Sequence, residues 1–144
     1  MLKYSFLSHS ANINEKKNND KETALHRAAY SDGNEEILEL LLSHRANFNE
    51  KNISGRTTLH LAALSNCKEI AEVLLSYCAN INEKDNYGQT ALHVAAYYGS
   101  KEITEVLVSR GANINEKNKD GKTAHLVAIE RNYGKIVTLL TYAA

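Results

Sequence analysis

Histidine and cysteine are the side chains of this chain that most readily bind transition metals or act as acid, base or nucleophile near neutral pH. The chain contains six histidines and two cysteines, Cys67 and Cys78. A structural zinc site needs four nitrogen or sulfur ligands, usually delivered in closely spaced pairs. The two cysteines are separated by ten residues, and no CxxC or HxxxH pair accompanies them. We therefore expect no metal, no cofactor and two reduced thiols.

Other catalytic motifs are also missing from the sequence. There is no glycine-rich phosphate loop, no G-x-S-x-G nucleophile motif and no carboxylate pair with an environment of its own. The sequence therefore predicts that this chain is not an enzyme. Three histidines remain of interest because they occur in one recurring local context: His26, His60 and His93.

That context recurs because the chain is built from internal repeats. The pattern Ala-Asn-(Ile or Phe)-Asn-Glu-Lys begins, at intervals of 35, 33 and 33 residues, at Ala11, Ala46, Ala79 and Ala112. A second pattern, TALHRAA in its first copy, begins at Thr23, Thr57, Thr90 and Thr123. We interpret the whole chain, 1–144, as a single domain. Its parts are the second helix of a preceding half-repeat at 1–10 and four repeats, at 11–45, 46–78, 79–111 and 112–144.

Each repeat predicts two helices and an extended turn. The threonine of the second pattern is a good N-cap for a short helix, which should end at Asn66 in the second copy and at Gly99 in the third. A longer amphipathic helix follows, from about Lys101 to Arg110 in the third copy, and Gly111 ends it. The segment between repeats alternates apolar and polar residues around a turn signal, where Lys21 takes the usual glycine position in the first copy.

The chain resembles the ankyrin repeat family, whose signature is T-P-L-H-x-A at a period of 33 residues. Alanine or threonine replaces the proline in all four copies. The resemblance implies an all-α fold, an α-solenoid of stacked helix-turn-helix ankyrin repeats joined by β-hairpin-like loops. It also implies that His26, His60 and His93 are structural, since this histidine typically bonds nearby backbone and links neighbouring hairpins.

The candidate binding site consists of positions that vary between otherwise constant copies. By resemblance to ankyrin repeats, these positions line a concave face and fingertips that contact partners. The candidate partner-binding residues are Tyr30, Arg56, Leu64, Tyr87, Gln89, Tyr97, Tyr98, Lys119, Glu130 and Arg131. Tyrosine and arginine often carry interface energy, so we expect Tyr30, Leu64, Tyr87 and Tyr97 to form a shallow apolar patch flanked by basic residues. The alternative is that Tyr97 or Tyr98 merely packs between repeats.

A Glu-Lys pair closes the first pattern in every copy, which predicts two rows of charge along the array. The pairs begin at Glu15, Glu50, Glu83 and Glu116. Because neighbouring copies should lie roughly a Debye length apart, we expect the rows to be mostly screened by salt and to form a solvated, salt-bridged face. Contact of the lysines with a partner is the alternative.

The charge balance bears on the class of partner. Lysine plus arginine and aspartate plus glutamate are equal at 17 each, which argues against nucleic-acid and anionic-membrane surfaces. No apolar run approaches the roughly 18 residues of a membrane span, and the first residues do not form a signal peptide. We expect no membrane insertion and a cytoplasmic location, with the nucleus left open.

The fourth copy departs from the others at His125 and Leu126, where Leu-His has become His-Leu. Either the two residues have exchanged, or one residue is lost before His125 and one is gained before Ile136. We favour the exchange, because the slip would put Ala124 where a core leucine belongs. Leu126 then lacks the histidine bond, and Ile129 hinders a fifth repeat.

The sequence predicts a non-catalytic interaction module or scaffold that binds a protein partner through its concave face and hairpin tips. One alternative is an auxiliary ankyrin segment of a larger enzyme or channel whose active part lies outside this chain. Another is a structural spacer, or an array that associates with itself through exposed end repeats.

Overall fold

A computed structural model describes residues 12–30 and 34–144, so the helix expected at 1–10 lies outside the described residues. Within these ranges the chain forms helices in pairs, and its β pairing is a single bridge between Lys17 and Glu22. The pairs are α2 (Ala24–Tyr30) and α3 (Glu35–Ser43), α4 (Thr58–Ser65) and α5 (Lys68–Ser76), α6 (Ala91–Tyr98) and α7 (Lys101–Ser109), and α8 (Ala124–Glu130) and α9 (Gly134–Ala143). The expected all-α solenoid is confirmed.

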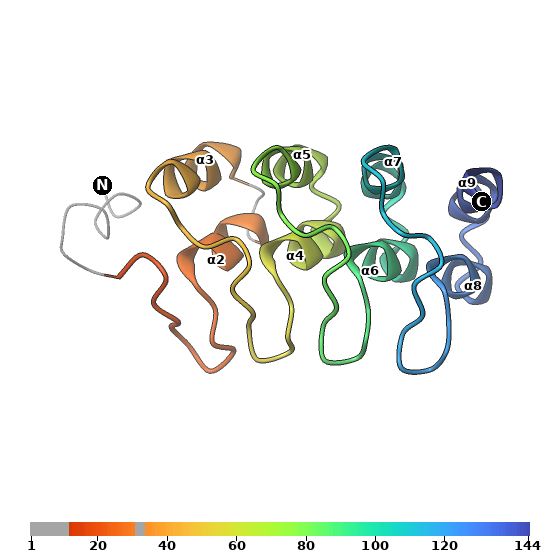
Figure 1. Cartoon of the computed structure of the whole chain (residues 1–144), viewed down its shortest axis with the longest axis horizontal. Coiled ribbons are helices and arrows are strands. Elements are labelled where there is room, and N and C mark those ends of the chain that lie inside the picture. Colours follow the sequence, from red (N-terminus) through yellow and green to blue (C-terminus); the bar gives the residue numbers. More distant parts are fainter. Residues whose placement is uncertain (1–11, 31–33) are drawn as a thin grey trace.

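The helices are arranged in two rows (Figure 1). The first helices of successive repeats, α2, α4, α6 and α8, pack against one another in order, and α3, α5, α7 and α9 form the second row. The extended loops between repeats project together from the first row, at the bottom of the figure. Each helix pair thus buries its apolar faces against the next pair, which is how a solenoid is stabilised.

The core combines the alanines of the first row with branched residues of both rows, including Leu25, Leu59 and Leu92 in the first. The alanines that face neighbouring repeats are fully covered: Ala29, Ala62, Ala63, Ala95, Ala96 and Ala128. Larger side chains from the second row are also fully or almost fully covered: Leu38, Leu41, Ile70, Leu74, Ile103, Leu107 and Ile136. Burial of one such aliphatic side chain contributes about 1.5–3 kcal/mol, so the second row supplies much of the hydrophobic stabilisation.

The expected helix ends are confirmed. Asn66 and Gly99 have left-handed backbones, with φ of 53° and 72°, and their N–H groups donate to the carbonyls of the preceding turn. Lys21 is also left-handed, with φ of 57°, in the place where Gly55 has φ of 75°. Asn66 and Lys21 thus keep the left-handed backbone that glycine has at the corresponding positions.

Each repeated histidine joins its own repeat to the next one. The Nδ1 atom of His60 accepts the N–H of Thr57 at 3.1 Å, so Nε2 carries the hydrogen and donates to the Gln89 carbonyl at 2.9 Å. His26 and His93 make equivalent bonds across repeat boundaries, at 3.1 and 2.9 Å. Burial lowers the pKa of all three imidazoles, because a covered cation would lose its hydration.

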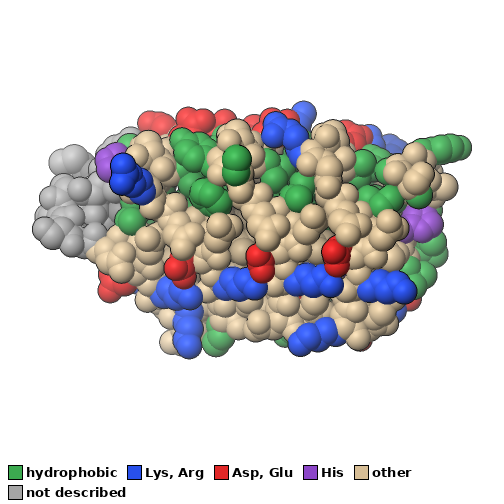
Figure 2. Space-filling view, in the orientation of Figure 1, with side chains coloured by type: hydrophobic (Ala, Val, Ile, Leu, Met, Phe, Trp, Pro, Cys, Tyr) green, Lys and Arg blue, Asp and Glu red, His purple; other side chains and the backbone are tan. Residues whose placement is uncertain are grey.

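The lysines of the first pattern also cross the boundaries between repeats (Figure 2). Lys51 Nζ lies 2.9 Å from the Glu83 carboxylate of the next repeat and donates to the Lys84 carbonyl at 3.1 Å. Lys16 and Lys84 make the same pair of contacts with the repeats that follow them. The expected salt-bridged face is confirmed, but opposite charges of neighbouring repeats are in direct contact and not mostly screened, because a lysine side chain is long enough to reach the next loop.

The fourth repeat keeps the exchanged register. The Thr123 side chain accepts the N–H of Leu126 at 3.3 Å, which is the bond that His93 makes in the third repeat. His125 is half-buried, and its Nε2 lies 2.9 Å from Thr141 Oγ1 on α9. The exchange is confirmed, and His125 lies within hydrogen-bond distance of Thr141 in the same repeat.

Candidate partner-binding surface

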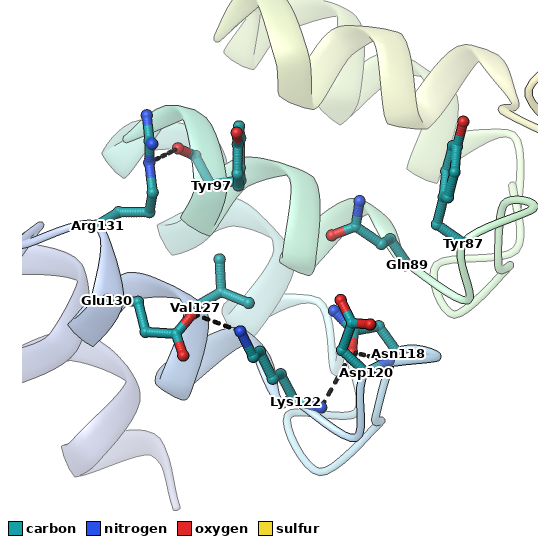
Figure 3. A pocket seen from close by; sticks show the side chains of 9 residues that line it. All are labelled: Tyr87, Gln89, Tyr97, Asn118, Asp120, Lys122, Val127, Glu130 and Arg131. Carbon is teal, nitrogen blue, oxygen red and sulfur yellow. Dashed lines mark hydrogen bonds and ion pairs between the residues drawn. The ribbon is translucent and has the colours of Figure 1, made fainter.

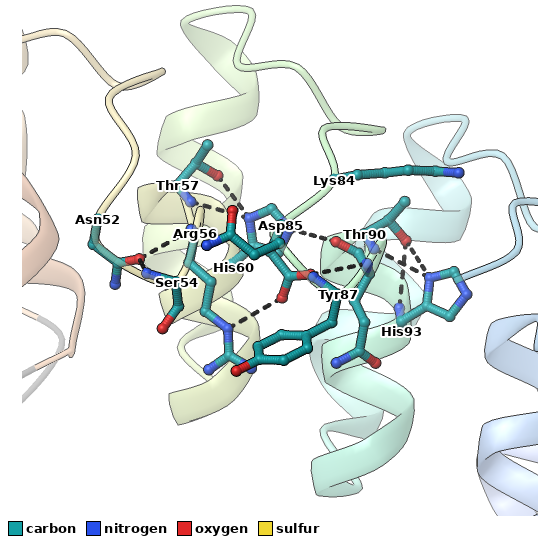
Figure 4. Close-up of polar contacts among 12 residues, drawn as sticks. Asn52, Ser54, Arg56, Thr57, His60, Lys84, Asp85, Tyr87, Thr90 and His93 are labelled. Atoms are coloured by element: carbon teal, nitrogen blue, oxygen red, sulfur yellow. Dashed lines mark hydrogen bonds and ion pairs between the residues drawn. The ribbon is translucent and has the colours of Figure 1, made fainter. Parts of the chain in front are cut away.

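An ion pair with a buried carboxylate joins two repeats beside the candidate surface (Figure 4). The Asp85 side chain is 0% exposed, and its Oδ2 lies 3.3 Å from Nε of Arg56 in the preceding repeat. Its Oδ1 accepts the N–H groups of Tyr87 and Gln89, each at 2.9 Å, and so shapes the loop tip. The charge of Arg56 is therefore already compensated by a carboxylate that solvent does not reach.

The first part of the surface, here called the tyrosine hollow, is a cavity of about 290 Å³. It is lined by Arg56, Tyr87, Gln89, Val94, Tyr97 and Tyr98. The rings of Tyr97 and Tyr98 meet edge to face, with centroids 5.0 Å apart, which is a favourable aromatic geometry. Tyr87, Tyr97 and Tyr98 are between 42% and 60% exposed. Packing between repeats therefore leaves a large part of each side chain accessible.

The second part, here called the arginine hollow, adjoins the first and has a volume of about 220 Å³ (Figure 3). It is lined by Tyr87, Gln89, Tyr97, Asn118, Asp120, Lys122, Val127, Glu130 and Arg131. The guanidinium of Arg131 lies 4.4 Å from the ring centroid of Tyr97, and its Nε donates to the Tyr97 carbonyl at 3.2 Å. Lys122 and Glu130 form an ion pair at 2.8 Å across the same hollow.

The structure places seven of the ten candidate residues in the lining of these two hollows: Arg56, Tyr87, Gln89, Tyr97, Tyr98, Glu130 and Arg131. The other three lie outside both. Tyr30 is exposed on α2, Leu64 packs partly against the core, and Lys119 sits at a loop tip where its N–H donates to the Tyr87 carbonyl. The apolar patch expected from four residues is therefore represented in the hollows by Tyr87 and Tyr97 alone.

The ten candidate residues did not include several lining residues or the aspartate beneath them. Asp120 and Lys122 are variable loop positions, and Val94 and Val127 are framework positions that the helix pattern marks as core. Asp85 could have been recognised from the sequence, because it is acidic at the position where the other copies have Asn18, Asn52 and Asn118. An acidic residue at a position otherwise held by asparagine indicates a charged neighbour.

The remaining reactive residues do not form a site in the described part of the chain. No group of three or more His, Cys, Asp or Glu side chains within residues 12–30 and 34–144 is placed to hold a metal ion. Cys67 is half-buried, and burial raises the pKa of its thiol, which makes it less reactive. The described helices are all too short or too polar to cross a membrane.

Paired helices, loops joined across repeats and an exposed aromatic surface define a repeat protein of the helical solenoid class. Residues 1–85 and 77–144 match the family model described as ankyrin repeats (3 copies), and the chain belongs to the ankyrin repeat family. Ankyrin repeats generally mediate interactions between proteins and are typically non-catalytic. No curated protein matches the chain.

Proposed function

We propose that this chain is a non-catalytic binding module that recognises a protein partner through the tyrosine hollow, the arginine hollow and the adjoining loop tips. The observation that carries the proposal is the exposure of Tyr87, Tyr97 and Tyr98 side by side on one surface. Exposed aromatic side chains gain most from burial at an interface, and tyrosine is enriched among residues that dominate binding energy.

The rigidity of this surface supports the proposal. Asp85 fixes the loop that carries Tyr87, and Tyr97 and its own carbonyl hold Arg131. Neighbouring loop tips are joined by backbone bonds, at 3.0 Å from Asn86 N–H to the Ser54 carbonyl and at 3.1 Å from Lys119 N–H to the Tyr87 carbonyl. Since few side chains and loops of this surface need to be ordered on association, little conformational entropy is lost.

Site-specific photo-crosslinking in cells of the source organism tests the proposal. A photoreactive phenylalanine derivative in place of Tyr87 or Tyr98 should give discrete covalent adducts with a protein. Tyr142 is a matched control, because it is 85% exposed on α9, away from both hollows. Adducts that form equally well from position 142, or from none of the three positions, would contradict the proposed surface.

A further inference from the structure

We propose that the partner presents an extended segment in which a bulky apolar side chain enters the tyrosine hollow and an acidic side chain two residues away binds Arg131. This inference rests on the proposed function, since it names the chemistry that the same surface recognises. It follows from the different charged groups that line the two hollows and from the residues that the hollows share.

The tyrosine hollow suits an uncharged side chain. Its lining is mostly aromatic and aliphatic. Among the described residues that line it, Arg56 alone carries a charged side chain. Because Arg56 already faces the covered carboxylate of Asp85 at 3.3 Å, its charge offers little to a ligand. A hollow lined by rings, with one amide at Gln89, favours a large apolar or aromatic group.

Arg131 differs from Arg56 because its charge has no acidic partner in the described part of the chain. Its neighbour Glu130 bonds to Lys122 instead. The Arg131 Nε is occupied by the Tyr97 carbonyl, and the guanidinium rests on the Tyr97 ring (Figure 3). Its terminal nitrogens therefore form a planar fork held in one place, which matches the two oxygens of a carboxylate.

Asp120 determines where in the arginine hollow an acidic group can lie. It lines this hollow from the loop side, whereas Arg131 approaches from the end of α8. Asp120 forms no salt bridge with the described residues, and Lys122, on which its charge acts, is already paired with Glu130, so the loop side of the hollow is unfavourable to a carboxylate. The acidic group is thus directed toward Arg131 and Tyr97, at the edge shared with the tyrosine hollow.

The two subsites adjoin each other, because Tyr87, Gln89 and Tyr97 line both hollows. The Arg131 guanidinium lies 4.4 Å from the Tyr97 centroid, and the Tyr97 and Tyr98 centroids are 5.0 Å apart. In an extended chain, side chains that point to the same face are two residues apart, or about 6.6 Å. Because the hollows share the Tyr97 ring, the proposal assigns the apolar anchor and the acidic residue to this shortest same-face spacing, with one residue between them.

Selection of random phage-displayed peptides on the purified chain tests this inference. We expect enrichment of peptides with Asp or Glu two positions from a large apolar residue. Arg131→Glu should lower the affinity of these peptides roughly tenfold to hundredfold, as expected for loss of a charged hydrogen-bonded pair, and should itself select Lys or Arg at that position. Arg110→Glu is the matched control, because Arg110 is an exposed C-cap of α7 as Arg131 is of α8, and it should select the same peptides as the unmodified chain.

The outcomes separate this inference from the proposed function. Enriched peptides that lose binding to Tyr97→Ala but show no acidic preference, or that bind Arg131→Glu unchanged, would overturn the inference and leave the proposed surface intact. Enriched peptides that still bind both Tyr87→Ala and Tyr97→Ala, or the absence of any enrichment, would count against both. Circular dichroism melts of every variant establish that a loss of binding is not a loss of fold.

Discussion

Arg56 and Asp85 are bound across the boundary between the second and third repeats, with Nε of one 3.3 Å from Oδ2 of the other and the aspartate side chain wholly covered. The corresponding joint between the third and fourth repeats has Gln89 and Asn118 instead. Asn118 still accepts two loop N–H groups at 3.0 Å each, so the amide can shape the loop without a charge. The Arg56–Asp85 ion pair therefore occupies the positions that Gln89 and Asn118 occupy, without a charge, at the next boundary between repeats.

The two arrangements predict strong coupling between the partners. Arg56→Gln leaves a covered carboxylate uncompensated and should cost about 3–5 kcal/mol, whereas Asp85→Asn should cost about 1–2 kcal/mol. The double variant, which recreates the next joint, should be more stable than Arg56→Gln alone. Urea unfolding of the four proteins measures the coupling, and simple additivity of the two losses would refute it.

The repeated histidines predict a loss of stability in mild acid. Burial depresses the folded-state pKa of His26, His60 and His93 below the ordinary value of about 6.5, so the unfolded chain binds protons first as the pH falls. The three histidines should therefore leave the free energy of unfolding at its full value above about pH 7. That free energy should decrease as the pH falls from about 6.5 toward the lowered pKa values. Each histidine adds up to about 1.4 kcal/mol per pH unit in that window.

Urea titrations at a series of pH values between neutral and mildly acidic measure this slope. Glu83 and Glu116 have lowered pKa values because Lys51 and Lys84 donate hydrogen bonds to them, so their contribution is lost only at lower pH. His60→Gln should reduce the slope in the histidine window. A slope that is unchanged in this variant would show that other groups cause the dependence.

A buried hydroxyl in the second repeat predicts a stabilising substitution. Thr58 is 1% exposed, and its Oγ1 has no hydrogen-bond partner among the described residues. The other repeats have alanine at this position. Thr58→Ala should raise the unfolding free energy by about 1 kcal/mol, because it removes an unsatisfied polar group and improves helix propensity. A lower midpoint in urea would show that the hydroxyl has a role that the contacts do not reveal.

Two loop glycines with nearly the same backbone predict different costs for a methyl group. Gly88 and Gly121 have φ of 73° and 72°, so alanine at either position should cost about 1 kcal/mol in left-handed strain. At Gly88 the added carbon would also lie 2.9 Å from the backbone nitrogen of Lys119, whereas nothing lies within 4 Å at Gly121. Gly88→Ala should therefore be clearly the less stable variant, and equal melting temperatures would contradict the close approach of the loops.

Residue types that recur in every copy were enough to predict the fold. The threonine N-caps, the helix ends at Asn66 and Gly99, and the register of His125 all depend on local sequence, which the repeats restate several times. The contacts between Lys51 and Glu83, and between Arg56 and Asp85, depend on how far one repeat is shifted from the next. That shift results from packing between repeats, and no single copy of the sequence contains it.

The same limit applies to the candidate site. Tyr87, Tyr97 and Arg131 could be proposed from their variability and residue type. The placement of the Arg131 guanidinium over the Tyr97 ring, which distinguishes it from Arg56, requires two repeats to be seen together. Tyr30 shares residue type and repeat position with Tyr97 and yet lies outside both hollows.

The histidine bonds all run in one direction, from each repeat to the carbonyl of its successor. An internal repeat is thus a donor on one side and an acceptor on the other, so recombination between copies could add or delete a whole repeat without stranding a buried polar group. Gene duplication could then change the length of the array, while each joint acquires its own surface. Leu126, which cannot donate such a bond, marks the repeat at which this interchangeability stops.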